Sequence, residues 1–583
     1  MSKTGIIYGI NGPVVYLKGD SGFKISEMVY VGKENLVGEV IGLKKGMTTV
    51  QVFEETTGLR PGETVTGTGD AISVLLGPGI IHNIFDGIQR PLEEIAKSSG
   101  KYISRGVSVD SLDTQKKWHS HITVKEGDVV GPGTIIAETQ ETASILHKSM
   151  VPPSITEGTV IKAAPDGDYT ILEPIVTIQL NDGTTKELAL AQKWPIRIPR
   201  PTHLRYPASV PLVTGQRILD TLFPIAKGGT AAVPGGFGTG KTMTQHQIAK
   251  WSDADIIIYI GCGERGNEMT QVLEDFSKLI DPKSGNLMMD RTTLIANTSN
   301  MPVAAREASV YTAMTLAEYY RSMGLKVLLM ADSTSRWAQA LREMSNRMEE
   351  LPGPDAFPMD LSAIISNFYG RAGYVYLNNG EVGSITFIGT VSPAGGNLKE
   401  PVTENTKKVA RCFYALEQDR ADKKRYPAVN PIDSYSKYIE YPEFEEYISK
   451  RINGEWTAKV NELKTRLLRG KEIAEQINIL GDDGVPVEYH VIFWKSEVID
   501  YVILQQDAFD EVDAVTPMER QEDILNLVVD ICRAEYKFDG FLEVMDYFKK
   551  LINLCKQMNY AEFKSEKFED YKRQIREMVA ERQ

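Results

Sequence analysis

A glycine-rich segment that ends in a lysine and a hydroxyl residue has the residue types needed to hold phosphate groups. Glycines let the main chain approach phosphate oxygens closely and aim its N–H groups at them. Lys241 would place a full positive charge on the terminal phosphates of a nucleotide, and the Thr242 hydroxyl could bind Mg²⁺. The segment consists of Gly235, Gly236, Phe237, Gly238, Thr239, Gly240, Lys241 and Thr242. It satisfies the pattern G-x-x-x-x-G-K-[ST], so we predict that these eight residues form a nucleotide-binding loop.

The residues on either side of this loop fit a strand, a loop and a helix in that order. A short apolar segment, residues 230–234, precedes the glycines, and a helix-like run, residues 243–251, follows them. The start of a helix adds a partial positive charge that favours phosphate. The alternative, a glycine-rich turn with Lys-Thr placed there by chance, does not explain both flanks.

Asp332 closes a second apolar run, residues 326–332, and is the candidate for the Mg²⁺ side of the site. An aspartate at the carboxyl end of a buried strand can hold the hydration shell of Mg²⁺ beside a phosphate loop. The alternative is that Asp332 caps the helix expected to begin near Ser333.

Glu264 and Arg265 follow another apolar run, residues 256–260, within the sequence Gly-Cys-Gly-Glu-Arg-Gly-Asn-Glu-Met. This position puts a carboxylate at the edge of the sheet where phosphate would bind. From the residues alone, Glu264 could equally be an acid that caps a helix.

The elements that must position these residues change in character along the chain. Short strands separated by Gly and Pro fill the first part, and continuous apolar runs that alternate with helical patterns fill the centre. An apolar stripe with helical spacing follows Trp456. We predict an α/β P-loop (RecA-like) core with an N-terminal β-barrel, an inserted β domain and a C-terminal helical bundle. The predicted boundaries are 1–75 for the barrel, 76–112 for a lead-in, 113–198 for the insertion, 199–438 for the nucleotide-binding domain and 439–583 for the helical domain.

Two central patterns make the α/β prediction specific. Residues 256–260, 293–296 and 327–331 are continuous apolar runs, as expected for parallel strands covered on both faces. Residues 309–323 are predicted to form an amphipathic helix between two of these strands.

Composition excludes several functional classes. The formal net charge of −13 disfavours a nucleic-acid partner, whose binding proteins are normally basic. Four cysteines without a pairing pattern fit a reducing cytosol, and no apolar run is long enough for a membrane helix. We therefore expect a cytoplasmic protein without direct membrane insertion, whose role at any membrane depends on other proteins.

His119 and His121 form an H-x-H pair that would lie on one strand face. The sequence places no acidic or cysteine ligand near them, so we predict ordinary histidines and no metal site.

Several long segments resemble the catalytic A subunit of V-type and A-type rotary ATPases, which belong to the ATPase alpha/beta chains family. The resemblance covers nearly the whole chain, including the insertion at 113–198. The matching segments are residues 85–91, 261–269, 296–307, 332–338, 427–430 and 434–436.

The resemblance implies roles for four side chains, including the Glu264 and Arg265 described above. Glu264 would orient the water that attacks the γ-phosphate, and Arg265 would lie in the same pocket and connect it to a neighbouring subunit. Tyr426 would lie against adenine, and Phe509 would form the second adenine wall. Without the resemblance, Arg265 could be an ion-pair residue, and the two aromatic residues would more often belong to a core.

The resemblance also implies the partners and cofactors. The chain would bind ATP or ADP with Mg²⁺ in an alternating hexameric ring with a B subunit, which supplies an arginine finger. Central-stalk and peripheral-stalk subunits would couple ATP hydrolysis or synthesis to hydrogen-ion or other ion transport through a membrane rotor. The chain would thus be cytoplasmic, peripheral on the membrane, and a poor ATPase when isolated.

Three alternatives fit parts of the pattern. An export- or secretion-type hexameric ATPase shares the architecture, but such chains are shorter and lack the 113–198 insertion. A non-catalytic regulatory subunit typically loses one of the residues retained here as Lys241, Thr242, Glu264 and Asp332. An RNA translocase is disfavoured by the acidic charge.

The sequence departs from the family at two positions. Ile364 stands where family members often carry an arginine, which could alter a contact between subunits. Thr239 stands where eukaryotic relatives carry a cysteine, so redox control through that position is excluded.

Overall fold

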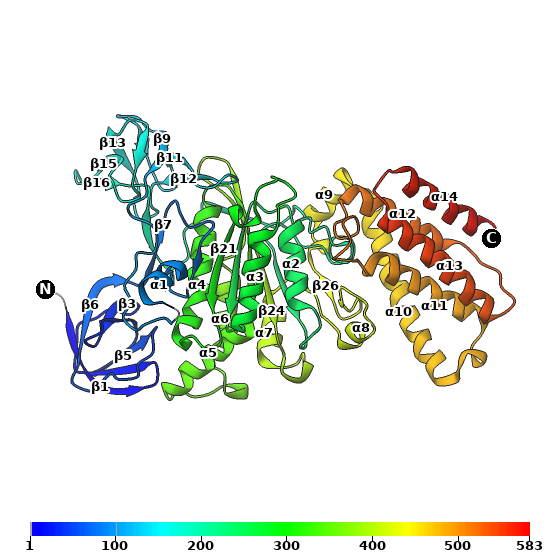
Figure 1. Cartoon of the computed structure of the whole chain (residues 1–583), viewed down its shortest axis with the longest axis horizontal. Coiled ribbons are helices and arrows are strands. Elements are labelled where there is room, and N and C mark those ends of the chain that lie inside the picture. The colour runs from blue at the N-terminus through cyan, green and yellow to red at the C-terminus, as the bar shows by residue number, and fades with distance from the viewer. Residues whose placement is uncertain (1–2, 101, 583) are drawn as a thin grey trace. The chain divides into compact units, whose positions relative to one another are not determined.

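The computed structural model describes residues 3–100 and 102–582 of the chain, and its elements are shown in Figure 1. The chain forms two compact units, each assembled from separate stretches of sequence. The first unit contains Met1–Tyr206, Ala254–Val391 and Lys399–Val409, and the second contains Pro207–Asp253, Ser392–Leu398 and Ala410–Gln583.

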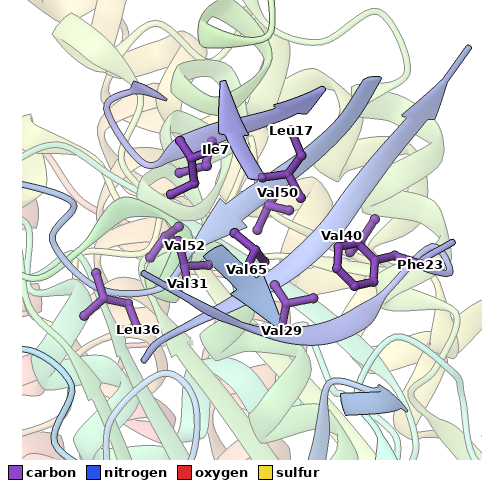
Figure 2. Close-up of a cluster of buried hydrophobic side chains, with 11 residues drawn as sticks. Ile7, Leu17, Phe23, Val29, Val31, Leu36, Val40, Val50, Val52 and Val65 are labelled. Atoms are coloured by element: carbon purple, nitrogen blue, oxygen red, sulfur yellow. The ribbon is translucent and has the colours of Figure 1, made fainter. Parts of the chain in front are cut away.

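The first unit begins with a closed β-barrel in the strand order β1-β2-β5-β4-β3-β6, as the sequence predicted. Alternate residues of these strands point inward and form an apolar core of valines with Ile7, Leu17 and Leu36, which Phe23 from the β2–β3 connection completes (Figure 2). Closure of the barrel leaves no unpaired strand edge. The strands are β1 (Thr4–Asn11), β2 (Val14–Lys18), β3 (Glu27–Val31), β4 (Leu36–Lys44), β5 (Met47–Val52) and β6 (Thr64–Ala71).

The inserted β segment forms two four-stranded sheets, β10-β13-β15-β16 and β12-β11-β9-β14. A short antiparallel pair, β7 (Ser73–Leu76) with β17 (Gln192–Pro195), joins the two ends of this insertion. Its strands are β9 (Trp118–Ile122), β10 (Val129–Val130), β11 (Ile135–Gln140), β12 (Leu146–Met150), β13 (Gly158–Ala163), β14 (Gly167–Tyr169), β15 (Val176–Leu180) and β16 (Thr185–Leu188).

The apolar runs of the central sequence form parallel strands, as predicted. In the first unit these strands have the order β24-β22-β20-β21-β8, and β23 and β18 extend them in antiparallel fashion. The strands are β8 (Ile84–Phe85), β18 (Leu204–Tyr206), β20 (Ile256–Cys262), β21 (Thr292–Asn297), β22 (Lys326–Asp332), β23 (Gly373–Tyr376) and β24 (Val382–Val391). All residues of β20 and β21 are buried, as expected for strands covered on both faces.

The helix predicted at 309–323 is part of α4 (Val303–Arg321), but the prediction that it is amphipathic is wrong. Nearly every residue of α4 is buried, including Glu307 and Glu318. Glu307 receives two hydrogen bonds of 2.7 Å from Arg197, and Glu318 is paired with Arg371. Charged partners from distant segments therefore allow polar residues of α4 to be buried. The other helices of the unit are α1 (Leu92–Ser99), α3 (Gly266–Lys278), α5 (Thr334–Arg347), α6 (Leu361–Tyr369) and α7 (Pro401–Val409).

The second unit combines a small strand group with the C-terminal helices. Strand β19 (Thr230–Pro234) pairs in parallel with β25 (Cys412–Phe413), which pairs with β26 (Tyr435–Ser436). The helices are α2 (Lys241–Trp251), α8 (Gln418–Asp422), α9 (Pro442–Arg451), α10 (Trp456–Leu480), α11 (Val487–Ile499), α12 (Met518–Arg533), α13 (Phe541–Tyr560) and α14 (Glu566–Ala580). Helices α10 and α11 pack so closely that a Cβ at Gly470 would lie 2.0 Å from the Ser496 hydroxyl. The predicted C-terminal helical region is confirmed.

Candidate nucleotide-binding and catalytic site

The glycine-rich loop joins β19 to α2 in the second unit, which confirms the predicted order of strand, loop and helix. Gly238 and Gly240 have φ angles of 80° and 87°, in the left-handed region that favours glycine. Helix α2 begins at Lys241, immediately after the loop. The N–H groups in the first turn of any helix have no acceptor within that helix, so they can donate hydrogen bonds to an anion.

Lys241 lies folded over the loop that precedes it. Its Nζ atom donates hydrogen bonds to the carbonyl oxygens of Gly235 and Gly236, both at 2.8 Å. The buried Thr239 hydroxyl donates to the Gly236 carbonyl, also at 2.8 Å. The positive charge is therefore held within the curve of the loop, where the predicted chemistry needs it.

A cavity of about 520 Å³ adjoins the loop within the same unit, and both predicted adenine walls line it. Tyr426 lies next to Gly240, because a Cβ placed on Gly240 would be 3.8 Å from a carbon of the tyrosine ring. The exposed fractions of Tyr426 and Phe509 are 44% and 85%, so neither residue belongs to a core. Two exposed aromatic rings beside a phosphate loop are suited to stack against a planar base.

Sequence reasoning missed part of this cavity. Tyr501, Lys556 and Tyr560 also line it, and the Tyr560 hydroxyl donates to Asp507 at 3.4 Å. Lys556 and Tyr560 belong to α13, far along the chain from the loop. Their spacing carries no motif, so no local signal could have indicated them.

A second cavity, of about 640 Å³, is lined by the first loop residues, Gly235, Gly236 and the highly exposed Phe237. Its lining includes Asn430, in one of the segments that resemble the rotary ATPases, and Asp433 just after it. The Asn430 amide donates to the Asp433 carboxylate at 3.0 Å, which stabilises this turn. The structure thus gathers all eight loop residues, Tyr426 and Phe509 within one unit.

Asp332 is the last residue of β22 in the first unit and has an exposed fraction of 3%. Its carboxylate accepts hydrogen bonds from the Tyr259 hydroxyl at 3.1 Å and from the Thr390 hydroxyl at 2.7 Å. Both bonds hold a carboxylate at the carboxyl end of a buried strand, as the sequence predicted.

Glu264 lies in the turn between β20 and α3 of the first unit. Gly263, with φ of 70°, begins this turn, and its N–H donates to the Asn297 carbonyl at 2.7 Å. The Glu264 carbonyl accepts from the Ser299 N–H at 2.9 Å. The turn is therefore tied to the segment that follows β21.

The Glu264 side chain belongs to a carboxylate cluster with Asp332 and Glu268. Partial burial, the negative charge of Asp332 and a hydrogen bond with Glu268 raise the pKa of Glu264 to about 8, and Arg336 opposes this rise. A cluster of this kind is relieved by a nearby cation. A strongly raised pKa at such a position also marks a candidate catalytic group.

Two arginines lie close to Glu264 in the chain or in space. Arg265 is exposed and immediately precedes α3. Arg306, which sequence reasoning missed, donates from Nη2 to the carbonyls of Thr298, Ser299 and Met301 at 3.1–3.5 Å. Arg306 therefore orders the segment whose N–H holds the Glu264 main chain.

The histidine pair of the insertion has acidic neighbours, contrary to the expectation from sequence. His119 bonds to Asp168 at 2.8 Å and His121 bonds to Asp166 at 2.7 Å, because β9 pairs with β14. All four side chains are exposed. Within residues 3–100 and 102–582, no group of three or more His, Cys, Asp or Glu side chains could hold a metal ion.

Sequence comparisons match three family models to successive parts of the chain. Residues 7–69 match the beta-barrel domain of the ATP synthase alpha/beta family. Residues 109–197 match the ATP synthase alpha/beta subunit barrel-sandwich domain, and residues 215–436 match the family's nucleotide-binding domain.

Full-length relatives decide the family. A V-type ATP synthase alpha chain of Halothermothrix orenii is 51% identical over 531 residues, which cover 91% of this chain and 89% of the relative. The chain belongs to the ATP synthase alpha/beta family. The A subunit of an A-type ATP synthase of Methanopyrus kandleri is 48% identical over 551 residues, covering 94% and 93% of the two chains. The predictions of a V/A-type A subunit, of a catalytic ATP-binding chain and of an enzyme are confirmed.

A solved member of the same fold is the assembled ATPase EscN of the enteropathogenic E. coli type III secretion system. Its TM-score is 0.62 at 20% identity, over 90% of this chain and 100% of EscN. This likeness confirms the predicted fold class and carries no argument about secretion, whereas the full-length relatives are ATP synthase subunits.

None of the helices in the described part of this ATP synthase subunit is long and apolar enough to cross a membrane.

Proposed function

We propose that this V/A-type A subunit hydrolyses or synthesises MgATP, with the nucleotide held in the second unit by the glycine-rich loop and the aromatic pocket. The observation that carries the proposal is that the cavity lined by Tyr426 and Phe509 is also lined by Gly238 and Gly240 of the loop, directly before Lys241. Phosphates would take the Lys241 ammonium from the carbonyls of the loop, and the base would lie between the two rings. In loops of this kind the main-chain N–H groups and the lysine together hold the β- and γ-phosphates.

We further propose, from the resemblance to rotary ATPases, that Thr242 and Asp332 are each Mg²⁺ ligands. Both supply oxygen donors, which this hard cation prefers, and Asp332 is already ordered by two hydroxyl groups. Only one or two protein oxygens are usual for Mg²⁺ in nucleotide sites, because water and phosphate complete its shell. When bound, the ion would neutralise charge on the β- and γ-phosphates.

Glu264 would orient and polarise the water that attacks the γ-phosphate. Its raised pKa means that its carboxyl group can hold or release a proton near neutral pH. The adjacent carboxylates that cause this rise are the groups that a Mg²⁺ ion or a cationic side chain would offset. The ionised form of Glu264 is the form that accepts a hydrogen bond from water.

The remaining charge in the transition state needs a further cation, since an arginine finger contributes about 10³–10⁵ in rate. We infer that a B subunit supplies it in an alternating hexameric ring, with Arg265 connecting the two subunits. The relatives are chains of multi-subunit ATP synthases, which supports a role next to stalk subunits and a membrane rotor. The chain would then be cytoplasmic and peripheral on the membrane.

The test compares the ATPase activity of the purified chain alone and after assembly with its B partner. The proposal predicts weak turnover for the isolated chain and a rise of about 10³-fold or more in the assembly. Full turnover by the isolated chain would refute the proposal that a partner supplies the arginine. It would not contradict the proposed nucleotide site.

A further inference from the structure

The two aromatic walls of the base pocket are carried by separate segments of the second unit. Tyr426 follows α8, and Phe509 follows the π-helical turn Asp500–Leu504 that extends α11. The two segments meet where the Gln506 N–H donates to the Tyr426 carbonyl at 3.0 Å. The separation of the rings therefore depends on what holds these segments together.

Asp500 is the centre of the ion-pair network that joins them. Its carboxylate accepts hydrogen bonds from Arg420 at 2.5 and 3.3 Å and from the Gln505 amide at 2.7 Å. Arg425 lies 3.4 Å from the same carboxylate and also makes a two-pronged contact with Glu497 at 3.1 and 2.9 Å. Asp500 and Arg420 are both buried, so solvent screens their interaction little.

The charge of Asp500 is secured by these partners. Burial would raise the pKa of Asp500, but the charges of Arg420 and Arg425 and the hydrogen bonds from Arg420 and Gln505 outweigh it and lower the pKa. The carboxylate is therefore ionised at neutral pH. A neutral side chain in its place would take the charged partner away from the buried Arg420 guanidinium, whereas Arg425 would keep its contact with Glu497.

The order of these residues in the chain gives the network its geometry. Arg420 and Arg425 lie on the segment that leads directly into Tyr426, and Asp500 and Gln505 lie on the segment that leads into Phe509. One carboxylate thus bridges the two supports of the base pocket. We propose that Asp500 is a positioning residue for the nucleobase, which sets the separation of Tyr426 and Phe509 without touching the nucleotide.

This inference rests on the proposed function, because it assumes that the base binds between these two rings. A positioning role for Asp500 predicts an effect on binding of the base, whereas a general stabilising role would affect all ligands alike. The phosphate loop is held by its own bonds from Lys241 and Thr239, none of which involves Asp500. Loss of Asp500 should therefore weaken ligands that carry a base and spare ligands that are phosphate alone.

A second set of hydrogen bonds, which does not include Asp500, should keep the Asp500→Asn variant folded. Arg217 donates to Asp513 at 2.5 Å and to the Gln505 carbonyl at 2.6 Å, and Gln506 donates to the Gly215 and Asp513 carbonyls. These contacts anchor the segment before Phe509 independently of Asp500. A change at Asp500 should therefore shift this segment locally.

The experiment measures equilibrium binding of Mg-ADP and of Mg-tripolyphosphate to the full chain and to Asp500→Asn. We expect the Kd for ADP to rise about tenfold and the Kd for tripolyphosphate to stay within about twofold, because base stacking contributes only to ADP. The matched control is Asp523→Asn, which removes a different carboxylate of the helical region, paired with Lys572 at 2.5 and 2.7 Å. This control should change neither constant.

Each other outcome gives a definite answer. Equal weakening of both ligands, or no change in either, would overturn the positioning role of Asp500. Failure of the unaltered chain to bind ADP would instead refute the proposed function itself. Should Asp500→Asn fail to fold, Arg425→Lys replaces it, since this change keeps the charge and loses the two-pronged contact with Glu497. Arg425→Lys must then show the same selective loss of ADP, and unchanged ADP binding by it would contradict the inference.

Discussion

The Nζ atom of Lys241 lies 2.8 Å from the carbonyl oxygen of Gly235, at the start of its own loop. The charged ammonium group therefore has a neutral acceptor, and a phosphate oxygen would form a stronger hydrogen bond with it. On nucleotide binding the ammonium would exchange the carbonyl for a phosphate oxygen. The loop would keep its conformation, because the Thr239 hydroxyl still donates to the Gly236 carbonyl.

Lys241→Ala should therefore weaken binding of ATP and of tripolyphosphate alike, by about 10- to 100-fold, since a hydrogen bond to a charged group contributes about 1.5–3 kcal/mol. Isothermal titration with both ligands measures this. Lys250→Ala, at the other end of α2, is the control and should leave both affinities unchanged. Unchanged affinity of Lys241→Ala for tripolyphosphate would show that Lys241 does not bind phosphate.

Tyr426→Ala and Phe509→Ala should raise the Kd for ADP by about 5- to 50-fold and spare tripolyphosphate, because each ring stacks only on the base. Phe509 is 85% exposed, so its loss should cost less than about 0.5 kcal/mol of stability. Ile479→Ala removes a similarly exposed apolar side chain from α10 and serves as the control. An unchanged ADP affinity in both ring variants would place the base elsewhere.

Asp332→Asn should raise the Mg²⁺ concentration needed for half-maximal ATPase activity by about tenfold or more. Asparagine keeps the size of the side chain and can still accept a hydrogen bond from one of the two hydroxyls, Tyr259 or Thr390, but it lacks the charge that attracts the ion. Titration of Mg²⁺ at fixed ATP measures the effect. Asp355→Asn, on an exposed turn, should behave as the unaltered chain does, and the same Mg²⁺ dependence in both variants would exclude Asp332 as a ligand.

The pKa of Glu264 gives a prediction about stability that needs no activity. In the folded chain it is raised to about 8 from an ordinary value of 4.5, so between these pH values the folded state keeps a proton that the unfolded state has lost. Stability contributed by this group is therefore present at low pH and is lost as pH rises towards 8. Glu264→Gln has no proton to lose and should be the more stable form at pH 8.5.

After allowance for partial exposure we expect a difference of about 1–2 kcal/mol at pH 8.5 that disappears near pH 4.5. Thermal unfolding without nucleotide and with a chelator of Mg²⁺ measures it. Glu274→Gln, on the exposed face of α3, should show no such dependence. Parallel curves for Glu264→Gln and the unaltered chain at all pH values would contradict the carboxylate cluster.

Much of the fold was predictable because its signals are local. Three apolar runs became β20, β21 and β22, and the glycine-rich loop became the link between β19 and α2. The amphipathic prediction for 309–323 failed because the polar residues of α4 are matched by Arg197 and Arg371 from distant segments. Partners of this kind leave no periodic trace in the sequence.

The candidate site shows the same division. The loop, Glu264 and Asp332 could be named because each belongs to a motif or ends an apolar run. Arg306 and Asp500 could not, because their effect comes from contacts with segments far along the chain, such as the bond from Arg420 to Asp500. His119 likewise gained its partner Asp168 only through the pairing of β9 with β14.

The central claim is that Glu264 activates the water that attacks a nucleotide bound by Lys241 and its loop. The most direct test is Glu264→Gln in the assembly with the B subunit, with nucleotide binding and steady-state ATPase activity measured on the same preparation. We predict that ADP and ATP bind within about threefold of normal and that turnover falls by about 10²–10⁴-fold, as expected for loss of a catalytic carboxylate. Near-normal turnover in that assembly would contradict the account.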